Sequence, residues 1–184
     1  TLHVGAGTFL PVKEDDVSKH PMHREQLVFT PGLIETLKSH QGPFIPVGTT
    51  ALRALESLYW SGVWLLDKKP IANGVLILPK EYAYEERLSV PSIQEALDAV
   101  LSYMKQQKLS HWVAETEILI MPGYTLHFCD GIITNFHQPK STLLVLIATL
   151  IGDDWKRVYE AALENDYRFL SYGDSSLLFK KKDI

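Results

Sequence analysis

Cysteine is almost absent from this sequence: Cys129 is the only one among 184 residues. A single thiol excludes an internal disulfide framework and a zinc site built from cysteines, and it is typical of proteins in a reducing cytosol. Long apolar runs are also missing. The longest extends from Leu143 to Ile151, is interrupted only by Thr149, and has half the length of a membrane span, so it indicates a buried helix.

The sequence also lacks a charged region followed by an apolar one at its start, so we expect no signal peptide, a cytoplasmic protein and no contact with a membrane. The stretch from Thr1 to Gly5 begins without Met and looks like the end of a strand, which predicts a fragment of a longer protein. Positive charge is not in excess either. The formal net charge of −4 means that a nucleic-acid partner must use a local basic patch.

What is present is an ordinary globular composition, with 46% hydrophobic and 22% charged residues, 11 Gly and 10 Pro. This balance excludes disordered, collagen-like and low-complexity proteins. The length suffices for a sizeable core, so we predict a single α/β domain over residues 1–184.

Helix starts are marked by capping residues and by apolar spacing. Predicted helices begin after Thr30, Gly48, Ser92 (with Glu95 completing a capping box), Ser141 and Asp153; the one after Ser141 is apolar nearly all round and is expected to be fully buried. Short apolar runs predict strands at 44–47, 75–78 and 117–121 and a hairpin of 125–128 with 131–134, and the remainder of 60–84 is expected to be irregular. The alternation favours a layered α/β fold with a mixed β-sheet and flanking helices.

Two glycine-containing turns are candidate binding loops. The first, Gly5 to Phe9 with Gly7 at its centre, could bring backbone N–H groups to an anion; the alternative is a plain tight turn. The second places Thr49 and Thr50 at a helix N-terminus, where the dipole favours a negative group. Arg53 and Glu56 follow at i, i+3 and can pair with each other or reach one site together; the alternative is a cap with a solvated salt bridge.

The segment from His20 to Glu25 has the spacing His-x-x-His-x-Glu of some metal sites. Pro21 breaks helical spacing and no further ligand is obvious, so a metal is not expected. A polar loop and an acid/base pair of His23 with Glu25 both remain open, since a carboxylate can orient an imidazole that exchanges protons near neutral pH.

The densest polar loop runs from Thr134 to Thr142, between a predicted strand and the apolar helix. Its side chains can converge on a ligand at the helix N-terminus, and the alternative is a cap with a histidine bound to a backbone carbonyl. Their number beside so apolar a helix favours a site that contains Asn135, His137, Ser141 and Thr142.

Near the C-terminus, residues 167–174 combine aromatic rings with charged groups around Gly173. Arg168 and Tyr172 suit stacking on a nucleobase, and Asp174 could hold a ribose hydroxyl. An edge strand with ordinary surface charges is the alternative. The basic run at 180–182 is usually a solvated tail and less often a phosphate contact.

These motifs together resemble the S-adenosylmethionine:tRNA ribosyltransferase-isomerase family, in the same order along nearly the whole chain. The resemblance rests on 5–9, 22–25, 47–50 with Arg53 and 55–57, 122–124, 134–137 with 139–142, and 167–174. It implies that the family's N-terminal segment and inserted β-barrel domain are missing here. Departures are Gln138 in place of Leu, Ser175-Ser176 in place of Ala-Met, and residues 60–109, which match no family pattern that we can place.

The resemblance implies an enzyme of queuosine biosynthesis that moves the ribosyl unit of S-adenosylmethionine to 7-aminomethyl-7-deazaguanine at the tRNA wobble position. Epoxyqueuosine forms, and adenine and methionine leave. S-adenosylmethionine is then the ribosyl-donor substrate, the tRNA is the partner, and a monomer without a metal is expected. A non-catalytic RNA- or nucleoside-binding paralogue and a metal hydrolase that uses His20, His23 and Glu25 are the rival hypotheses.

On this interpretation each group of candidate residues has a role. His23 with Glu25, or His137, would be the base that removes a proton next to the sulfonium. The nucleoside or tRNA would meet Arg168, Tyr172 and Asp174. The residues expected to bind S-adenosylmethionine are Gly7, Thr49, Thr50, Arg53, Asn135, Ser141 and Thr142.

Overall fold

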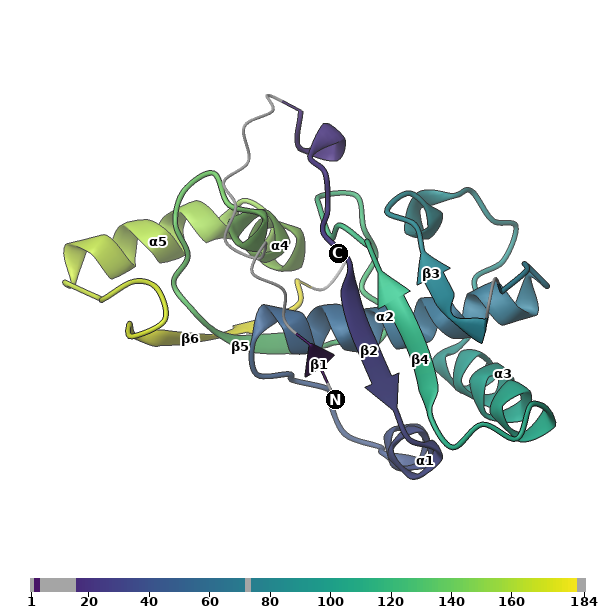
Figure 1. Cartoon of the computed structure of the whole chain (residues 1–184). Coiled ribbons are helices and arrows are strands. Elements are labelled where there is room, and N and C mark those ends of the chain that lie inside the picture. The colour runs from purple at the N-terminus through teal and green to yellow at the C-terminus, as the bar shows by residue number, and fades with distance from the viewer. Residues whose placement is uncertain (1, 4–15, 72–73, 182–184) are drawn as a thin grey trace.

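A four-stranded mixed sheet forms one part of the molecule (Figure 1). The computed structural model describes residues 2–3, 16–71 and 74–181. The strand order is β1-β2-β4-β3, in which β2 runs antiparallel to both neighbours and β3 runs parallel to β4. The strands are β1 (Leu2–His3), β2 (Glu25–Phe29), β3 (Leu76–Leu78) and β4 (Trp112–Thr116). The predicted mixed α/β architecture is confirmed.

A second, two-stranded antiparallel sheet lies beside α4 (Thr142–Ile151) and α5 (Asp154–Glu164). It pairs β5 (Gly131–Asn135) with β6 (Ser175–Phe179). Ile133 of β5 pairs with Leu177 of β6, which lies 44 residues further along the sequence, so the pairing is long-range.

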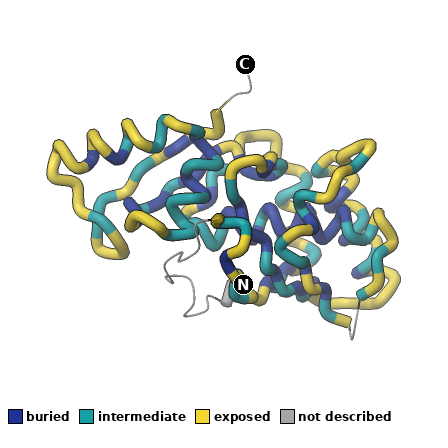
Figure 2. The backbone as a smooth tube through the Cα atoms, turned by 90° about the horizontal axis from the view of Figure 1, so that it is seen from above, coloured by how far each residue is buried: buried dark blue, intermediate teal, exposed yellow. Residues whose placement is uncertain are grey.

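The long helix α2 (Thr49–Leu66) connects the two sheets. It begins next to β5 and runs behind the four-stranded sheet (Figure 1). Its middle is buried throughout from Leu52 to Ala54 and from Glu56 to Val63, so it is the centre of the core. Buried residues lie in the interior of the molecule, and exposed residues lie along its outer loops and outer helix faces (Figure 2). The helix α3 (Ile93–Gln106) packs closely on it, because a Cβ added at Gly62 would lie 2.1 Å from the carbonyl oxygen of Ala96.

Helix ends follow the local sequence signals. The side chains of Thr30, Ser92 and Ser141 each accept a hydrogen bond from a backbone N–H in the first turn of α1 (Pro31–Ser39), α3 and α4. The capping box of Ser92 with Glu95 is formed. Short 3₁₀ turns lie at Val17–Lys19 and Tyr82–Tyr84.

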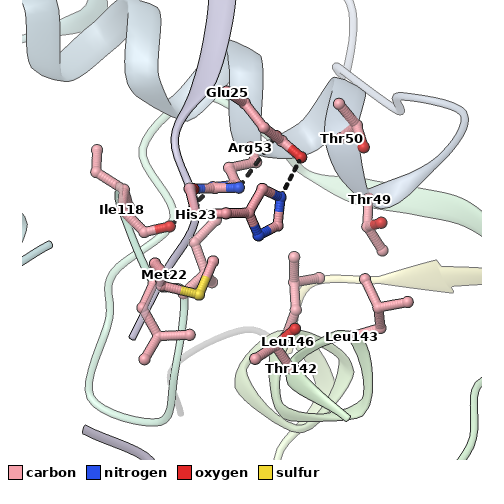
Figure 3. Close-up of a pocket in the computed structure, with 12 residues that line it drawn as sticks. Met22, His23, Glu25, Thr49, Thr50, Arg53, Ile118, Thr142, Leu143 and Leu146 are labelled. Atoms are coloured by element: carbon pink, nitrogen blue, oxygen red, sulfur yellow. Dashed lines mark hydrogen bonds and ion pairs between the residues drawn. The ribbon is translucent and has the colours of Figure 1, made fainter. Parts of the chain in front are cut away.

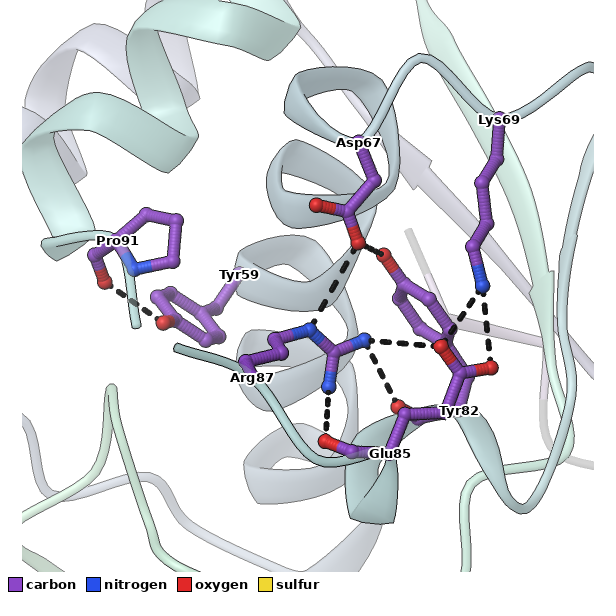
Figure 4. Close-up of polar contacts among 7 residues, drawn as sticks. All are labelled: Tyr59, Asp67, Lys69, Tyr82, Glu85, Arg87 and Pro91. Atoms are coloured by element: carbon purple, nitrogen blue, oxygen red, sulfur yellow. Dashed lines mark hydrogen bonds and ion pairs between the residues drawn. The ribbon is translucent and has the colours of Figure 1, made fainter. Parts of the chain in front are cut away.

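The segment around the 3₁₀ turn at Tyr82–Tyr84 contacts α2 and the residue after it through polar side chains (Figure 4). The guanidinium of Arg87 lies 4.5 Å from the Tyr82 ring centroid and 4.8 Å from that of Trp60. Tyr82 donates a 2.7 Å hydrogen bond to Asp67, and Tyr59 donates one of 2.7 Å to the carbonyl of Pro91. Residues 60–109 therefore contribute much of the core, through the end of α2, β3 and α3. That residues 1–184 form a single domain stays a prediction.

Several strand predictions are wrong. Residues 44–47 form no strand, because Pro46 has no N–H to donate; they lie along β5 with a single bridge from Val47 to Ile133. Residues 117–121, which were expected to form a strand, form none; the strand in this region is β4, which ends at Thr116. The expected hairpin is absent, since β5 pairs with β6 and residues 125–128 form no strand.

Two helix predictions also need correction. Residues 60–66 were expected to be irregular and instead continue α2, whose aromatic side chains pack in the core. The helix α4 is only partly buried: Leu146, Ile147, Leu150 and Ile151 are covered and the remaining apolar side chains are half-exposed. Within the described residues, no helix has both the length and the apolar character needed to cross a membrane.

Candidate functional site

Two adjoining cavities lie at the start of α2, and they share Thr49, Thr50 and Leu143. The smaller has a volume of about 30 Å³ and is lined by the segment before β2, the segment after β4 and the start of α4 (Figure 3). The larger has a volume of about 300 Å³ and lies between the start of α2, the end of β5 and the loop that precedes α4.

The smaller cavity contains a linked histidine, carboxylate and guanidinium. His23 Nε2 lies 3.1 Å from Glu25 Oε1, and Arg53 Nη1 lies 3.0 Å from Glu25 Oε2. Glu25 is only 2% exposed, whereas the side chain of His23 is 26% exposed. The predicted contact of His23 with Glu25 is therefore confirmed, and the histidine is the more exposed member of the pair (Figure 3).

Arg53 also lines this cavity, and it is only 7% exposed. Besides Glu25, its guanidinium donates to the carbonyl oxygens of Ile118 at 2.9 Å, Thr116 at 3.0 Å and His23 at 3.2 Å. Burial lowers the pKa of Arg53, and the charge of Glu25 opposes that shift. These contacts hold α2, the end of β4 and the residues before β2 together.

The possible pairing of Arg53 with Glu56 is wrong, because the two side chains serve different parts of the chain. Glu56 is fully buried and accepts hydrogen bonds from the backbone N–H groups of residues 127–129, at 2.8 to 3.0 Å, and from the hydroxyl of Tyr124 at 2.8 Å. Burial raises the pKa of Glu56, and the backbone N–H groups oppose the shift. The sequence pattern missed this role, because no local signal identifies partners about 70 residues away.

The larger cavity brings together several residues from the predicted polar loop. Asn135, His137 and Ser141 line it with Thr49 and Thr50. Asn135 donates through Nδ2 to the carbonyl of Gly173 at 3.1 Å, and Ser141 caps α4. Thr142 lines the smaller cavity instead. The structure therefore brings these candidate residues of the polar loop next to the start of α2, but distributes them over two cavities.

His137 is buried, with 8% exposure, and its Nε2 lies 3.0 Å from Thr134 Oγ1. Its backbone N–H donates to the hydroxyl of Tyr159 at 3.1 Å. Burial lowers the pKa of His137 to about 4, so the imidazole is neutral at neutral pH. In the alternative interpretation of this loop the histidine binds a backbone carbonyl, whereas in the structure the partner of its ring is the side-chain hydroxyl of Thr134.

The candidate nucleoside-binding residues lie outside both cavities. Arg168 pairs with Asp174 at 3.1 Å, and hydrogen bonds from Arg168 lower the pKa of Asp174. Tyr172 is 96% exposed. The same segment does reach the larger cavity, through Leu170 and Ser171.

Three further groups of residues were singled out in the sequence: Gly7, the histidines with metal-like spacing, and the basic run at 180–182. Gly7 lies outside the described residues. Among the residues that the structure describes, no three His, Cys, Asp or Glu side chains are grouped as metal ligands, and His20, His23 and Glu25 therefore form no such group. In the basic run, Lys180 donates to the carbonyl of Leu126 and Lys181 pairs with Asp154.

Comparison with known proteins agrees with the resemblance. A model of the family described as "Queuosine biosynthesis protein" matches residues 1–178. The chain belongs to this family. Members include the S-adenosylmethionine:tRNA ribosyltransferase-isomerases of Cereibacter sphaeroides, 40% identical over 182 residues, and of Caulobacter vibrioides, 39% identical over 184 residues. These alignments cover 97% and 98% of the chain, but only 40% and 38% of the two relatives.

A solved structure shows the same similarity. The crystal structure of the S-adenosylmethionine tRNA ribosyltransferase from Thermotoga maritima superimposes with a TM-score of 0.52 at 25% sequence identity. The match covers 83% of this chain and 40% of the other. The chain thus spans about two fifths of the length of the queuosine-family relatives that it matches.

Proposed function

We propose that this chain carries out part of queuosine biosynthesis, as a transferase-isomerase that moves the ribosyl unit of S-adenosylmethionine to 7-aminomethyl-7-deazaguanine in the wobble position of a tRNA. Epoxyqueuosine, adenine and methionine are the products. The observation that carries the proposal is the linked His23, Glu25 and Arg53 in a cavity at the start of α2, in a chain of the queuosine family.

The reaction needs a base, because a proton next to the sulfonium must leave. A sulfonium makes its neighbouring C–H bonds acidic, and His23 is a base oriented by a buried carboxylate. Arg53 in turn holds the carboxylate that orients the histidine. The smaller cavity admits little more than one water or one reacting carbon, which suits a proton transfer and excludes the body of a substrate.

His137 is better suited to binding than to proton removal. An imidazole whose pKa lies near 4 is a weak base at neutral pH, but it can still donate or accept a hydrogen bond. We therefore assign the base to His23 with Glu25, and binding of S-adenosylmethionine to Thr49, Thr50, Asn135, His137 and Ser141. Arg168 and Tyr172 are exposed and remain our candidates for contact with the tRNA. We further propose a monomer that works in the cytoplasm.

The test is an assay of epoxyqueuosine by mass spectrometry, after incubation with S-adenosylmethionine and tRNA that carries 7-aminomethyl-7-deazaguanine. It is run on this chain and on the complete gene product. Release of adenine is measured in parallel. Epoxyqueuosine from the complete gene product supports the proposal. Binding of the tRNA without any product would instead support a non-catalytic RNA-binding relative.

A further inference from the structure

We infer that the larger cavity is a subsite for an uncharged, flat, nitrogen-containing ring, which in the proposed reaction is the adenine ring of S-adenosylmethionine. This inference rests on the proposed function, because that function supplies the ligand. It assigns the two cavities to different parts of one substrate.

Size gives the first argument. The larger cavity has about 300 Å³, which lies at the lower end of the volumes of small-molecule sites. The smaller cavity, at about 30 Å³, cannot contain any ring. Because the two share Thr49, Thr50 and Leu143, a ring in the larger one places its attached sugar toward His23.

Charge gives the second argument. Among the residues described, the larger cavity is lined by no Asp, Glu, Lys or Arg, and burial keeps His137 neutral. A charged group that enters such a cavity loses its hydration without gaining a partner, which is costly. In S-adenosylmethionine the sulfonium and the amino-acid end are charged, whereas the adenine is not. The carboxylate of Glu25 lies in the smaller cavity, on the side where the sulfonium would then be.

Hydrogen-bonding groups give the third argument. The N-cap residue of α2, Gly48, provides no side-chain acceptor, so N–H groups of the first turn remain available for ring nitrogens. Asn135 uses Nδ2 for the carbonyl of Gly173, which leaves its amide oxygen to accept from an exocyclic amine. Apolar side chains, among them Val47 and Leu170, complete the walls for the faces of a ring.

The experiment fills the larger cavity without changing the smaller one. Ala51 lines only the larger cavity and lies in the first turn of α2. Ala51→Leu adds bulk there and keeps a good helix former. Ala161→Leu makes the same change at an exposed position of α5 and is the control. Binding of free adenine and, separately, of methionine is measured by titration calorimetry on the complete gene product.

We expect Ala51→Leu to weaken adenine binding at least tenfold and to leave methionine binding unchanged, while Ala161→Leu alters neither. Equal adenine affinity in Ala51→Leu and wild type, or no adenine binding by an active wild type, would overturn the subsite. Should Ala51→Leu not fold, Ala51→Val makes the same test with a smaller side chain. Epoxyqueuosine is assayed on the same samples. Adenine binding that Ala51→Leu abolishes, in a wild type that makes no epoxyqueuosine, would contradict the proposed function and leave the subsite intact.

Discussion

Individual buried residues hold the walls of the site in place. Glu56 is the clearest case, because one carboxylate accepts hydrogen bonds from three consecutive backbone N–H groups and from Tyr124. Tyr124 itself accepts a 2.7 Å hydrogen bond from the indole of Trp60. This network fixes the segment that leads into β5, and β5 ends at the larger cavity.

Glu56→Ala should therefore destabilise the chain by about 3–5 kcal/mol, because it leaves buried N–H groups without an acceptor. The free energy of unfolding is measured by urea titration at pH 7. Glu160→Ala, at an exposed position of α5, is the control and should change it by less than about 0.5 kcal/mol. A loss for Glu56→Ala as small as that of the control would contradict the role of the network.

The neutral state of His137 predicts a pH dependence of stability. Burial lowers its pKa from 6.5 to about 4, so between these values the unfolded chain binds more protons than the folded chain. Stability is then fully present above pH 6.5 and falls as the pH decreases toward 4. One such group accounts for a loss of about 2 kcal/mol between pH 7 and pH 5. His127, whose pKa burial also lowers to about 4, contributes in the same direction.

Urea unfolding at several pH values between 7 and 5 measures this loss. His137→Gln should reduce the loss by about 2 kcal/mol, since glutamine does not titrate. His111→Gln replaces an exposed histidine and should leave the dependence unchanged. If His137→Gln loses as much stability as wild type over this range, the histidine is not held neutral by the fold.

At the scale of elements, the contact of α2 with α3 determines how the core packs. A methyl group at Gly62 would collide with the backbone of Ala96. Backbone atoms inside a helix cannot move aside alone, so one of the two helices would have to shift as a whole. Gly62→Ala should therefore cost about 3 kcal/mol of stability, although alanine is the better helix former.

Gly32→Ala is the matched control for this substitution. Gly32 lies in α1, and an added Cβ would meet nothing within 4 Å. It should be neutral or raise stability by up to about 1 kcal/mol. Thermal and urea unfolding of the two variants give the comparison. Equal stability of the two would show that the helices do not approach as closely as we describe.

What the sequence predicted correctly about the elements was local. Thr30, Ser92 and Ser141 mark helix starts, because a capping side chain and its acceptor N–H lie within three residues. Strand pairing is not local: β5 was predicted to pair with 125–128 and pairs instead with β6, far along the chain. No turn signal in the sequence distinguishes these partners, because the choice depends on packing of the whole domain.

The same limit applies to the candidate site. His23 and Glu25 are two residues apart, and their contact could be predicted from the sequence. Arg53 was expected to bind ligand or to pair with Glu56. Its actual partners, Glu25 and the carbonyls of Thr116 and Ile118, lie up to 65 residues away and depend on the burial of α2. Residues of a site that touch only through tertiary packing leave no local pattern.

At the scale of the whole molecule, α2 packs against both sheets (Figure 1). Its first turn lines two adjoining cavities, one beside the start of β2 and the other beside the end of β5. One cavity has a titratable pair next to a buried guanidinium, and the other has an uncharged lining. A substrate with a charged reacting centre and an uncharged ring is complementary to this pair of cavities. That correspondence is the central claim of our proposal.

Deuterium incorporation from heavy water into the 5′ hydrogens of S-adenosylmethionine tests this claim most directly. The complete gene product is incubated with S-adenosylmethionine and substrate tRNA, and the exchange is followed by mass spectrometry. We predict that wild type exchanges these hydrogens, that His23→Ala does not, and that His137→Ala still does so with weaker binding of S-adenosylmethionine. Exchange in His23→Ala as fast as in wild type would contradict the account, because the pair of His23 with Glu25 would then be structural and the base would lie elsewhere.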